Sequence, residues 1–194
     1  MYFKLQKNKE LNSKVNKFYK KYNKEILDIL LFGSAVKGKD KPKDLDILIL
    51  FKYKESLEIT QELKIELKNF NPEITIKTWD SLRTPNFQAR EAFLSESFSL
   101  IKQEYLSKTL GFQNITLFKY ELKGLTSSKR VSFQYALYGR DKKSGIVKEL
   151  SLAKFSDSVI LCPIENTEKL KEFFKNWNLK VNSFPILIPE RIIM

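Results

Sequence analysis

Two apolar runs separated by a short polar loop constrain the fold of this chain more than any other feature. The first run, Ile26 to Phe32, stops at Gly33-Ser34, and the second, Leu45 to Phe51, begins directly after Asp44. Short runs rich in Ile and Leu predict strands that are buried on both faces of a sheet. The loop between them therefore lies at one end of that sheet.

Amphipathic segments surround these two strands. Apolar residues from Leu11 to Ile26 recur at three-to-four spacing, which predicts a helix that forms an outer layer or a lid. The same spacing predicts a helix over 55–70 that Asn71-Pro72 terminates. Residues 74–79 alternate between apolar and polar, as a half-exposed third strand does. A long helix is expected over 86–107.

The sequence changes character after Leu110-Gly111. Strands are expected over 115–122, 159–164 and 184–188, and Thr126-Ser127-Ser128 and Asn166-Thr167 are expected to cap two helices. We therefore predict an α/β (α+β) fold in two units that pack together. Residues 1–110 form a small mixed-sheet domain, and residues 111–194 form a second small α/β domain that is basic and rich in aromatic residues.

The composition excludes several kinds of chemistry. The chain has no histidine, so every Ser-His and Cys-His arrangement is absent, and a reaction must rest on carboxylates, lysines or an oxygen-bound metal. The single cysteine, Cys162, lies in an apolar run and is expected to be a buried thiol. Disulfides and a zinc cluster are excluded.

The composition also indicates the cellular location of the protein and the kind of partner that it binds. No stretch approaches the roughly 18 consecutive apolar residues of a membrane span, and residues 1–10 lack the hydrophobic region of a signal peptide. We expect a cytoplasmic protein without a membrane partner; the sequence does not indicate its oligomeric state. The net charge of +12 favours an anionic partner such as RNA, DNA or a phosphorylated ligand, although a lysine-rich composition has other origins.

The loop between the two strands carries the features of a nucleotide site. A strand that ends in Gly33-Ser34 lets backbone N–H groups approach phosphate oxygens, and the Ser34 hydroxyl adds a further donor. Gly38 allows the chain to leave this turn in a left-handed conformation. Asp44 and Asp46, two apart on a strand, point the same way and lie roughly 7 Å apart. Such carboxylates can hold divalent metal beside a triphosphate.

Each of these residues also has an ordinary structural interpretation. Residues 39–44 fit a solvated charged turn, and Asp44 fits the entry to a strand. The combination of a strand, Gly-Ser, a glycine four residues after the serine and Asp-x-Asp before an apolar run favours the functional interpretation.

This pattern resembles the polymerase β superfamily of nucleotidyltransferases, in particular its small prokaryotic stand-alone members. The resemblance covers roughly residues 24–106. It implies that Gly33 and Ser34 contact nucleotide phosphates, that Asp44 and Asp46 are the catalytic metal ligands, that Mg²⁺ or Mn²⁺ is the cofactor, and that a nucleoside triphosphate is the substrate.

The chain departs from the family pattern at two places. The third strand of the family usually supplies another carboxylate, whereas the alternation here puts Thr75 and Lys77 on the expected face, so the third ligand is predicted to be absent. Glu73 or Asp80 would replace it only with a different register. Lys43 stands where the family usually has a serine, and it either touches a phosphate or is solvated.

Aromatic and basic residues interleave in the second unit. Rings that stack on bases, with cations that follow phosphates, would make a platform for single-stranded nucleic acid; the alternative is that the rings form the core of the unit. The candidate nucleic-acid contacts are Lys129, Arg130, Tyr138, Arg140, Lys142 and Lys143.

Two functional hypotheses follow. The first is a metal-dependent nucleotidyltransferase that moves a nucleoside monophosphate to a hydroxyl acceptor on nucleic acid, or, as in toxin–antitoxin systems of this superfamily, on a protein. The second is a catalytically impaired domain of this fold that binds nucleic acid or protein, a hypothesis that rests on the missing third acid.

Overall fold

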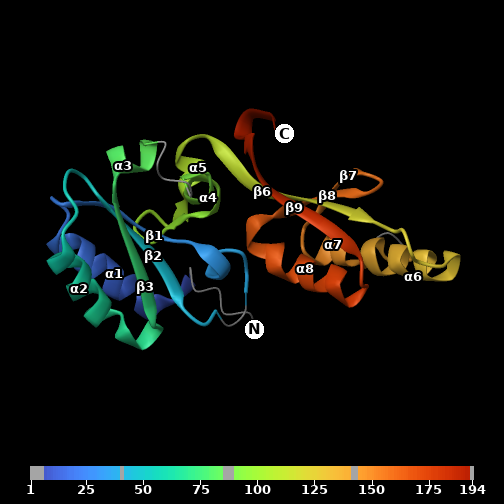
Figure 1. Ribbon diagram of the computed structural model, residues 1–194, viewed down its shortest axis with the longest axis horizontal. Coiled ribbons are helices and arrows are strands. Elements are labelled where there is room, and N and C mark those ends of the chain that lie inside the picture. Colours follow the sequence, from blue (N-terminus) through green and yellow to red (C-terminus); the bar gives the residue numbers. More distant parts are fainter. Residues whose placement is uncertain (1–6, 40–41, 85–89, 141–143, 193–194) are drawn as a thin grey trace.

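The computed structural model describes residues 7–39, 42–84, 90–140 and 144–192 (Figure 1). It has a five-stranded sheet with the order β3-β2-β1-β4-β5 and a four-stranded sheet with the order β7-β8-β6-β9. Helices pack on both sheets, so the predicted α/β (α+β) class with a second small sheet unit is confirmed.

The first sheet is built around the two apolar runs. Its strands are β1 (Ile26–Leu31), β2 (Leu45–Phe51), β3 (Pro72–Thr78), β4 (Phe98–Ser99) and β5 (Glu104–Tyr105). β2 runs antiparallel to β1 and parallel to β3, which makes the sheet mixed. α2 (Leu57–Glu66) and the short 3₁₀ turn η3 (Lys68–Phe70) provide the crossover that a parallel pair of strands requires.

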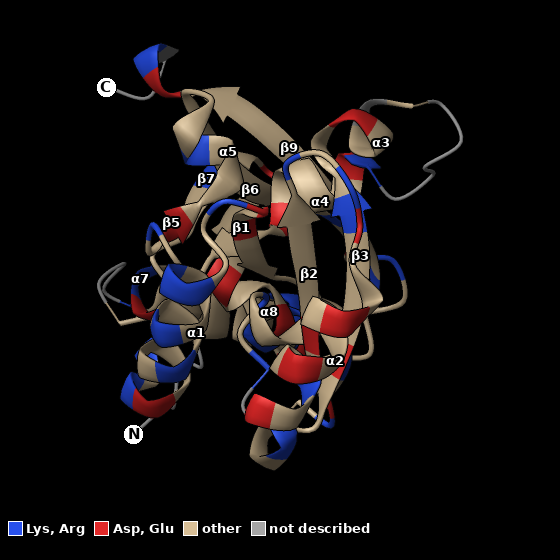
Figure 2. Ribbon diagram, turned by 90° about the vertical axis from the view of Figure 1, so that its left-hand side faces the viewer, with Lys and Arg blue, Asp and Glu red and all other residues tan. Residues whose placement is uncertain are grey.

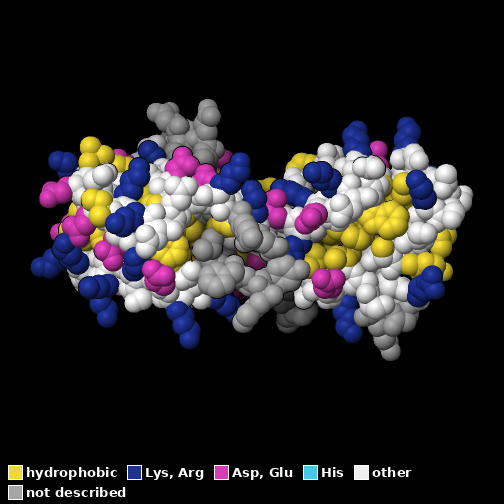
Figure 3. All heavy atoms as spheres, turned by 90° about the horizontal axis from the view of Figure 1, so that it is seen from below, with side chains coloured by type: hydrophobic (Ala, Val, Ile, Leu, Met, Phe, Trp, Pro, Cys, Tyr) yellow, Lys and Arg dark blue, Asp and Glu magenta, His cyan; other side chains and the backbone are white. Residues whose placement is uncertain are grey.

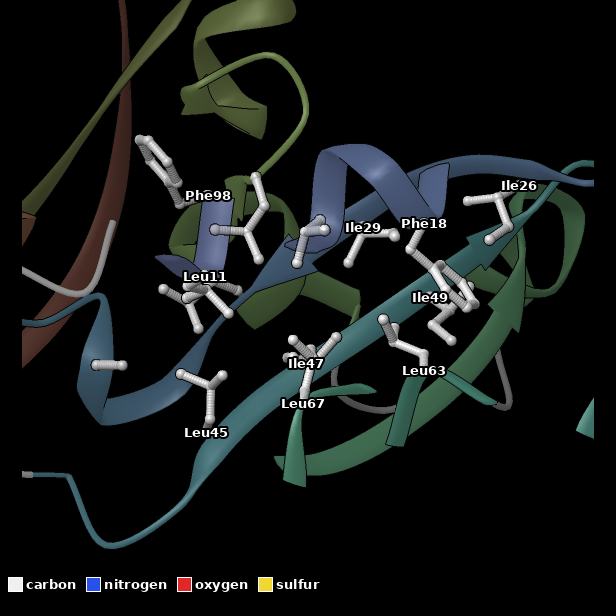
Figure 4. Close-up of a cluster of buried hydrophobic side chains, with 14 of the residues drawn as sticks. Leu11, Phe18, Ile26, Ile29, Leu45, Ile47, Ile49, Leu63, Leu67 and Phe98 are labelled. Carbon is white, nitrogen blue, oxygen red and sulfur yellow. The ribbon is translucent and has the colours of Figure 1, made fainter. Parts of the chain in front are cut away.

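Two helices cover one face of this sheet. α1 (Lys9–Lys21) begins at Asn8, whose side chain accepts the Leu11 N–H, and α2 begins at Ser56 in the same way. Their apolar faces pack on alternate residues of β1 and β2, including Ile29, Ile47 and Ile49, as Figure 4 shows. In Figure 2 the outer turns of α1 carry mainly basic residues and those of α2 carry acidic ones.

Three short helices cover the opposite face: α3 (Trp79–Arg83), α4 (Arg90–Glu96) and α5 (Leu106–Thr109). Leu82, Phe93 and Leu106 from these helices pack on Leu48 and Leu50 of β2. Because β2 is buried on both faces, its sequence is an almost continuous apolar run. Asp46 is the one residue of β2 that is not fully buried.

A buried carboxylate joins β1 to β4. Asp28 is only 3% exposed, and its Oδ1 accepts the Ile29 N–H at 2.8 Å and the Ser99 hydroxyl at 2.7 Å. Burial raises the pKa of Asp28, and the two hydrogen bonds and Lys102 partly offset that rise.

The prediction of one long helix over 86–107 is wrong. Within the described part, helix covers only α4 and α5, and β4 and β5 lie between them; residues 85–89 fall outside the described ranges. β4 pairs with β1 through Leu30 and Leu31. The apolar spacing over 93–101 fits a helix locally, but pairing with a strand distant in sequence decides the conformation.

The second unit is a sheet with helices on one face (Figure 1). Its strands are β6 (Phe112–Glu121), β7 (Ala153–Ser156), β8 (Val159–Pro163) and β9 (Lys180–Pro189), and its helices are α6 (Ser127–Tyr138), α7 (Ile146–Glu149) and α8 (Thr167–Asn176). β7 and α7 were not anticipated from the sequence. Phe118, Tyr120, Phe133 and Phe174 are buried together, which confirms the core interpretation for these rings.

The two units contact each other beside the loop that follows β1. The backbone N–H of Glu168, in the first turn of α8, donates to the Lys37 carbonyl at 3.1 Å. Ile164, in the 3₁₀ turn η4 (Ile164–Asn166), joins the core of the first unit. The loop thus caps a helix of the second unit, and the expectation that the units pack together is confirmed.

A last 3₁₀ turn, η5 (Glu190–Ile192), follows β9. In the part of the chain that the structure describes, no helix has the length and apolar character needed to cross a membrane.

Candidate active site

The glycine-serine bend and the second strand meet at the candidate site. η2 (Gly33–Ala35) follows β1 and starts with Gly33 at φ +72°, a conformation that residues with a side chain rarely adopt. A Cβ at Gly33 would overlap the carboxylate of Asp46. The Phe32 N–H donates to the Asp46 carbonyl at 3.1 Å, which holds the two segments together. The absence of a side chain at Gly33 therefore makes room for the Asp46 carboxylate.

Asp46 is the second residue of β2, and Asp44 directly precedes the strand. Leu45, between them, is 2% exposed and belongs to the core beneath α1 and α2, so the alternation of β2 directs Asp46 away from that core. Desolvation is the largest cause that raises the pKa of Asp46, and the negative charges of Glu73 and Asp44 add to it. The acids are therefore close enough to repel one another.

Glu73 is a third acid beside this pair, which corrects an expectation from the sequence. In the parallel pairing of β2 with β3, Glu73 lies opposite Asp46, Thr75 opposite Leu48 and Lys77 opposite Leu50. Thr75 and Lys77 thus share the face of Asp46, and Glu73, two residues earlier, shares it too. The expectation that Glu73 needs a different register was wrong. Asp80 lies in α3, not on the strand.

The residues present suit a divalent cation that also has substrate ligands. Within the described residues, no three acidic or cysteine side chains come close enough to hold a metal ion by themselves. Mg²⁺ is usually bound by one or two carboxylates together with water and substrate phosphates, and Asp44, Asp46 and Glu73 offer oxygen ligands of that kind. A cation would also offset the desolvation and repulsion that raise the pKa of Asp46. The donor set therefore fits.

Asn71 positions the first of these acids and was not recognised from the sequence as a site residue. Its Nδ2 donates to the Lys43 carbonyl at 3.1 Å, and its own carbonyl accepts the Leu45 N–H at 3.0 Å. These two bonds bracket Asp44. Asn71 has φ +48°, which asparagine tolerates better than most residues. The Asn-Pro sequence at 71–72 is the signal that could have indicated such a turn.

The other predicted residues of the loop have different surroundings. Ser34 is half-buried in η2, and Lys43 is exposed at the entry to β2. Gly38 has the expected positive φ, +86°, and a Cβ there would overlap the backbone carbonyl of Glu165. The structure thus places Gly38 against the second unit. Lys37, next to it, forms an ion pair with Glu96 of α4 at 2.7 Å.

The candidate nucleic-acid residues separate into two places. Tyr138 and Arg140 line a pocket at the end of α6, whereas Lys129 and Arg130 lie in its first turns, nine residues or about 13 Å away along the helix. The Arg130 Nε donates to the Leu125 carbonyl at 3.1 Å. Lys142 and Lys143 lie outside the described residues.

These features define the first unit as an α/β domain in which acidic residues of adjacent strands gather at a glycine-serine bend. Residues 13–104 match the model of a protein family described as polymerase beta, nucleotidyltransferase. This match covers most of the first unit and confirms the resemblance drawn from the sequence. The match ends before β6, so it does not include the second unit. Searches of curated proteins and of solved structures returned no match.

Proposed function

We propose that the chain is a metal-dependent nucleotidyltransferase that transfers a nucleoside monophosphate from a nucleoside triphosphate to a hydroxyl group, with nucleic acid as the acceptor. The observation that carries the proposal is the contact of the Asp46 carboxylate with Gly33, next to Ser34 and with Glu73 in register beside it. The bend at Gly33-Ser34 suits a phosphate, and the carboxylates beside it suit a cation.

The bend would hold the triphosphate. The first backbone N–H groups of a helical turn have no partner within that turn, so those of η2 can donate to phosphate oxygens, as can the Ser34 hydroxyl. Asp44 and Asp46 would hold Mg²⁺ or Mn²⁺, which when bound neutralises phosphate charge and stabilises the departing pyrophosphate.

The reaction forms one bond and breaks one. The acceptor oxygen attacks the α-phosphorus, the bond from this phosphorus to the bridging oxygen breaks, and pyrophosphate leaves with the electron pair. The proton of the acceptor hydroxyl passes to a carboxylate, and we assign this role to Glu73. Glu73 is exposed, so an acceptor can reach it, and it lies opposite Asp46.

The two units would have different roles in the reaction. We propose that residues 1–110 carry out the transfer and that residues 111–194 bind the acceptor, because the second unit has the interleaved basic and aromatic residues and packs against Lys37 and Gly38. The net charge of +12 supports an anionic acceptor.

The proposal is tested by transfer of label from each of the four α-labelled nucleoside triphosphates, with Mg²⁺ or Mn²⁺, to RNA, DNA and protein acceptors. We expect label on nucleic acid. Asp46→Asn should reduce the rate by more than the roughly 10- to 100-fold typical of losing an outer partner of a metal ligand, and Glu73→Gln should lower the rate constant more than the nucleotide affinity. Asp80→Asn, an exposed acid on α3, is the matched control and should leave the rate unchanged.

A second candidate function has one observation in its favour. Because no three acids among the described residues gather tightly enough to hold a metal alone, the domain also fits a binding module without transfer activity. Wild-type protein that transfers no label with either metal, yet binds nucleic acid, would establish this alternative. Label on protein alone would instead make the acceptor a polypeptide.

A further inference from the structure

A pocket in the second unit combines aromatic rings with cations. It has a volume of about 480 Å³ and is lined by Gln134, Tyr135, Tyr138, Gly139, Arg140, Val147, Lys148 and Lys154. These residues come from the end of α6, the start of α7 and β7. In Figure 1 this end of α6 belongs to the unit remote from β2 and β3. The pocket is therefore distinct from the site at Asp46.

Two cations lie over the two tyrosine rings of the pocket. The Arg140 guanidinium carbon is 5.5 Å from the centre of the Tyr135 ring, and the Lys154 Nζ is 5.9 Å from the centre of the Tyr138 ring. Both distances lie within the roughly 6 Å at which a cation is attracted to a ring face. Tyr135 nevertheless keeps 47% of its surface exposed. An exposed ring beside a guanidinium can stack on a base while the cation meets a phosphate.

Two glycines hold the walls of this pocket together. Gly139 ends α6 at φ +83°, and a Cβ there would lie 2.7 Å from the Ser144 N and 2.9 Å from the Gly145 N. A Cβ at Gly145, which begins α7, would overlap the end of α6. The close approach of these two backbones holds the end of α6 against the start of α7, and Arg140 and Lys148, which follow these glycines, both line the pocket.

The charge around the pocket favours a polyanion. α6 contains no acidic residue and carries Lys129 and Arg130 in its first turns. Figure 3, a view from below, shows a hydrophobic patch on this unit with both basic and acidic side chains near it. Lys154 also forms an ion pair with the exposed Asp157 at 2.7 Å, whereas Arg140 and Lys148 add positive charge at the opening.

We propose that this pocket is a binding site for single-stranded nucleic acid, in which a base stacks on Tyr135 and the flanking phosphates contact Arg140 and Lys148. The volume suits one base with its sugar, and the cations placed around the rings suit a continuous phosphate backbone. This inference rests on the proposed role of the second unit in binding the acceptor. Because binding does not require transfer chemistry, a strand-binding assay can fail while label transfer persists, and the reverse, so the two failures are distinguishable.

The test is fluorescence anisotropy of labelled RNA and DNA strands of about 12 nucleotides with the full-length protein, in EDTA and without triphosphate. Tyr135→Ala should weaken binding by at least about fivefold, since loss of one stacked base is worth about 1 kcal/mol or more. Arg140→Ala should weaken it comparably, and Arg140→Lys should weaken it less because the charge remains. Since Tyr135 is nearly half exposed and lies outside the buried core of the unit, its replacement leaves that core intact.

Matched control variants distinguish binding in the pocket from nonspecific electrostatic attraction to the protein surface. Tyr53→Ala removes a tyrosine that is 87% exposed in the first unit, and Lys20→Ala removes an exposed lysine of α1; both should change the dissociation constant by less than about twofold. With two cations contacting phosphates, the logarithm of affinity should fall with the logarithm of salt concentration at a slope of about −1.4, and Lys148→Ala should reduce the magnitude of this slope by about 0.7.

Three results would overturn the proposal. The first is an equal loss of affinity in the pocket variants and the controls. The second is binding of a mononucleotide as tightly as the strand. The third is tighter binding of double-stranded nucleic acid or a phosphopeptide than of the single strand.

Discussion

Substitution of Gly33 by alanine should separate catalysis from stability. At this position a Cβ would overlap the Asp46 Oδ2 and would lie 3.1 Å from the Asp46 Cγ. The backbone is part of η2 and of the bend held by the Phe32–Asp46 hydrogen bond, so the side chain of Asp46 is the part that moves. Its carboxylate must retreat by about 1 Å, and a misplacement of that size costs about 100-fold in rate.

The stability cost of the same change is modest. Alanine at the positive φ of Gly33 loses roughly 1–2 kcal/mol, which corresponds to a fall of about 2–8 °C in Tm for a chain of this size. Gly111→Ala is the matched control, because Gly111 has a similar φ of +77° and no atom lies within 4 Å of the site of its Cβ. The control should show the same fall in Tm.

The assay is label transfer at a temperature at which both variants are folded by circular dichroism. Gly33→Ala should lose about 100-fold in rate, and Gly111→Ala should remain within about threefold of the wild type. Equal rates in the two variants would refute the reasoning, because the position of the Asp46 carboxylate would then not matter.

Substitutions at Asp28, Lys37 and Gly38 test the packing, each measured by urea unfolding. Asp28→Asn keeps an oxygen acceptor for the Ile29 N–H and the Ser99 hydroxyl, so it should be at least as stable as the wild type at pH 7, whereas Asp28→Ala should lose about 1–3 kcal/mol; equal losses would contradict this. Because the folded-state pKa of Asp28 is raised, wild-type stability from this group is greatest below its unfolded pKa and falls as pH rises through the folded pKa, and Asp28→Asn should remove that dependence. Lys37→Met should leave the Glu96 carboxylate, 14% exposed, without its partner, and a double-mutant cycle with Glu96→Gln should give a coupling of about 1 kcal/mol; a coupling of zero would show that the ion pair is not formed in solution. Gly38→Ala should lose about 1–3 kcal/mol more than Gly124→Ala, because both glycines have positive φ but only Gly38 faces a carbonyl, that of Glu165; equal losses would mean that the two units do not pack at Gly38.

The strands and helices that the sequence predicted correctly are those with a strong local pattern. The run from Leu45 to Phe51 is β2, buried on both faces, and the apolar stripe from Leu11 is α1. The cap at Thr126 is also confirmed, because its side chain accepts the Lys129 N–H. In each case the residues that decide the conformation are neighbours in sequence, so spacing alone reveals them.

The errors concern contacts between distant segments. The sequence around Phe98–Ser99 does not reveal that this segment pairs with β1. The apolar spacing of the surrounding residues is helical, so a helix was predicted there. Glu73 was set aside although the alternation itself puts it on the face of Thr75 and Lys77; only the pairing of β2 with β3 shows that it lies beside Asp46. Asn71 was read as a helix terminator, and its bonds on either side of Asp44 depend on the same pairing.

The most direct test of the central claim is the anomalous scattering of Mn²⁺ in a crystal of the protein grown with a non-hydrolysable nucleoside triphosphate. The account predicts a metal peak in contact with carboxylate oxygens of Asp44 and Asp46, with the phosphates against Gly33 and Ser34. A triphosphate bound away from this bend, or a metal that touches neither aspartate, would contradict it.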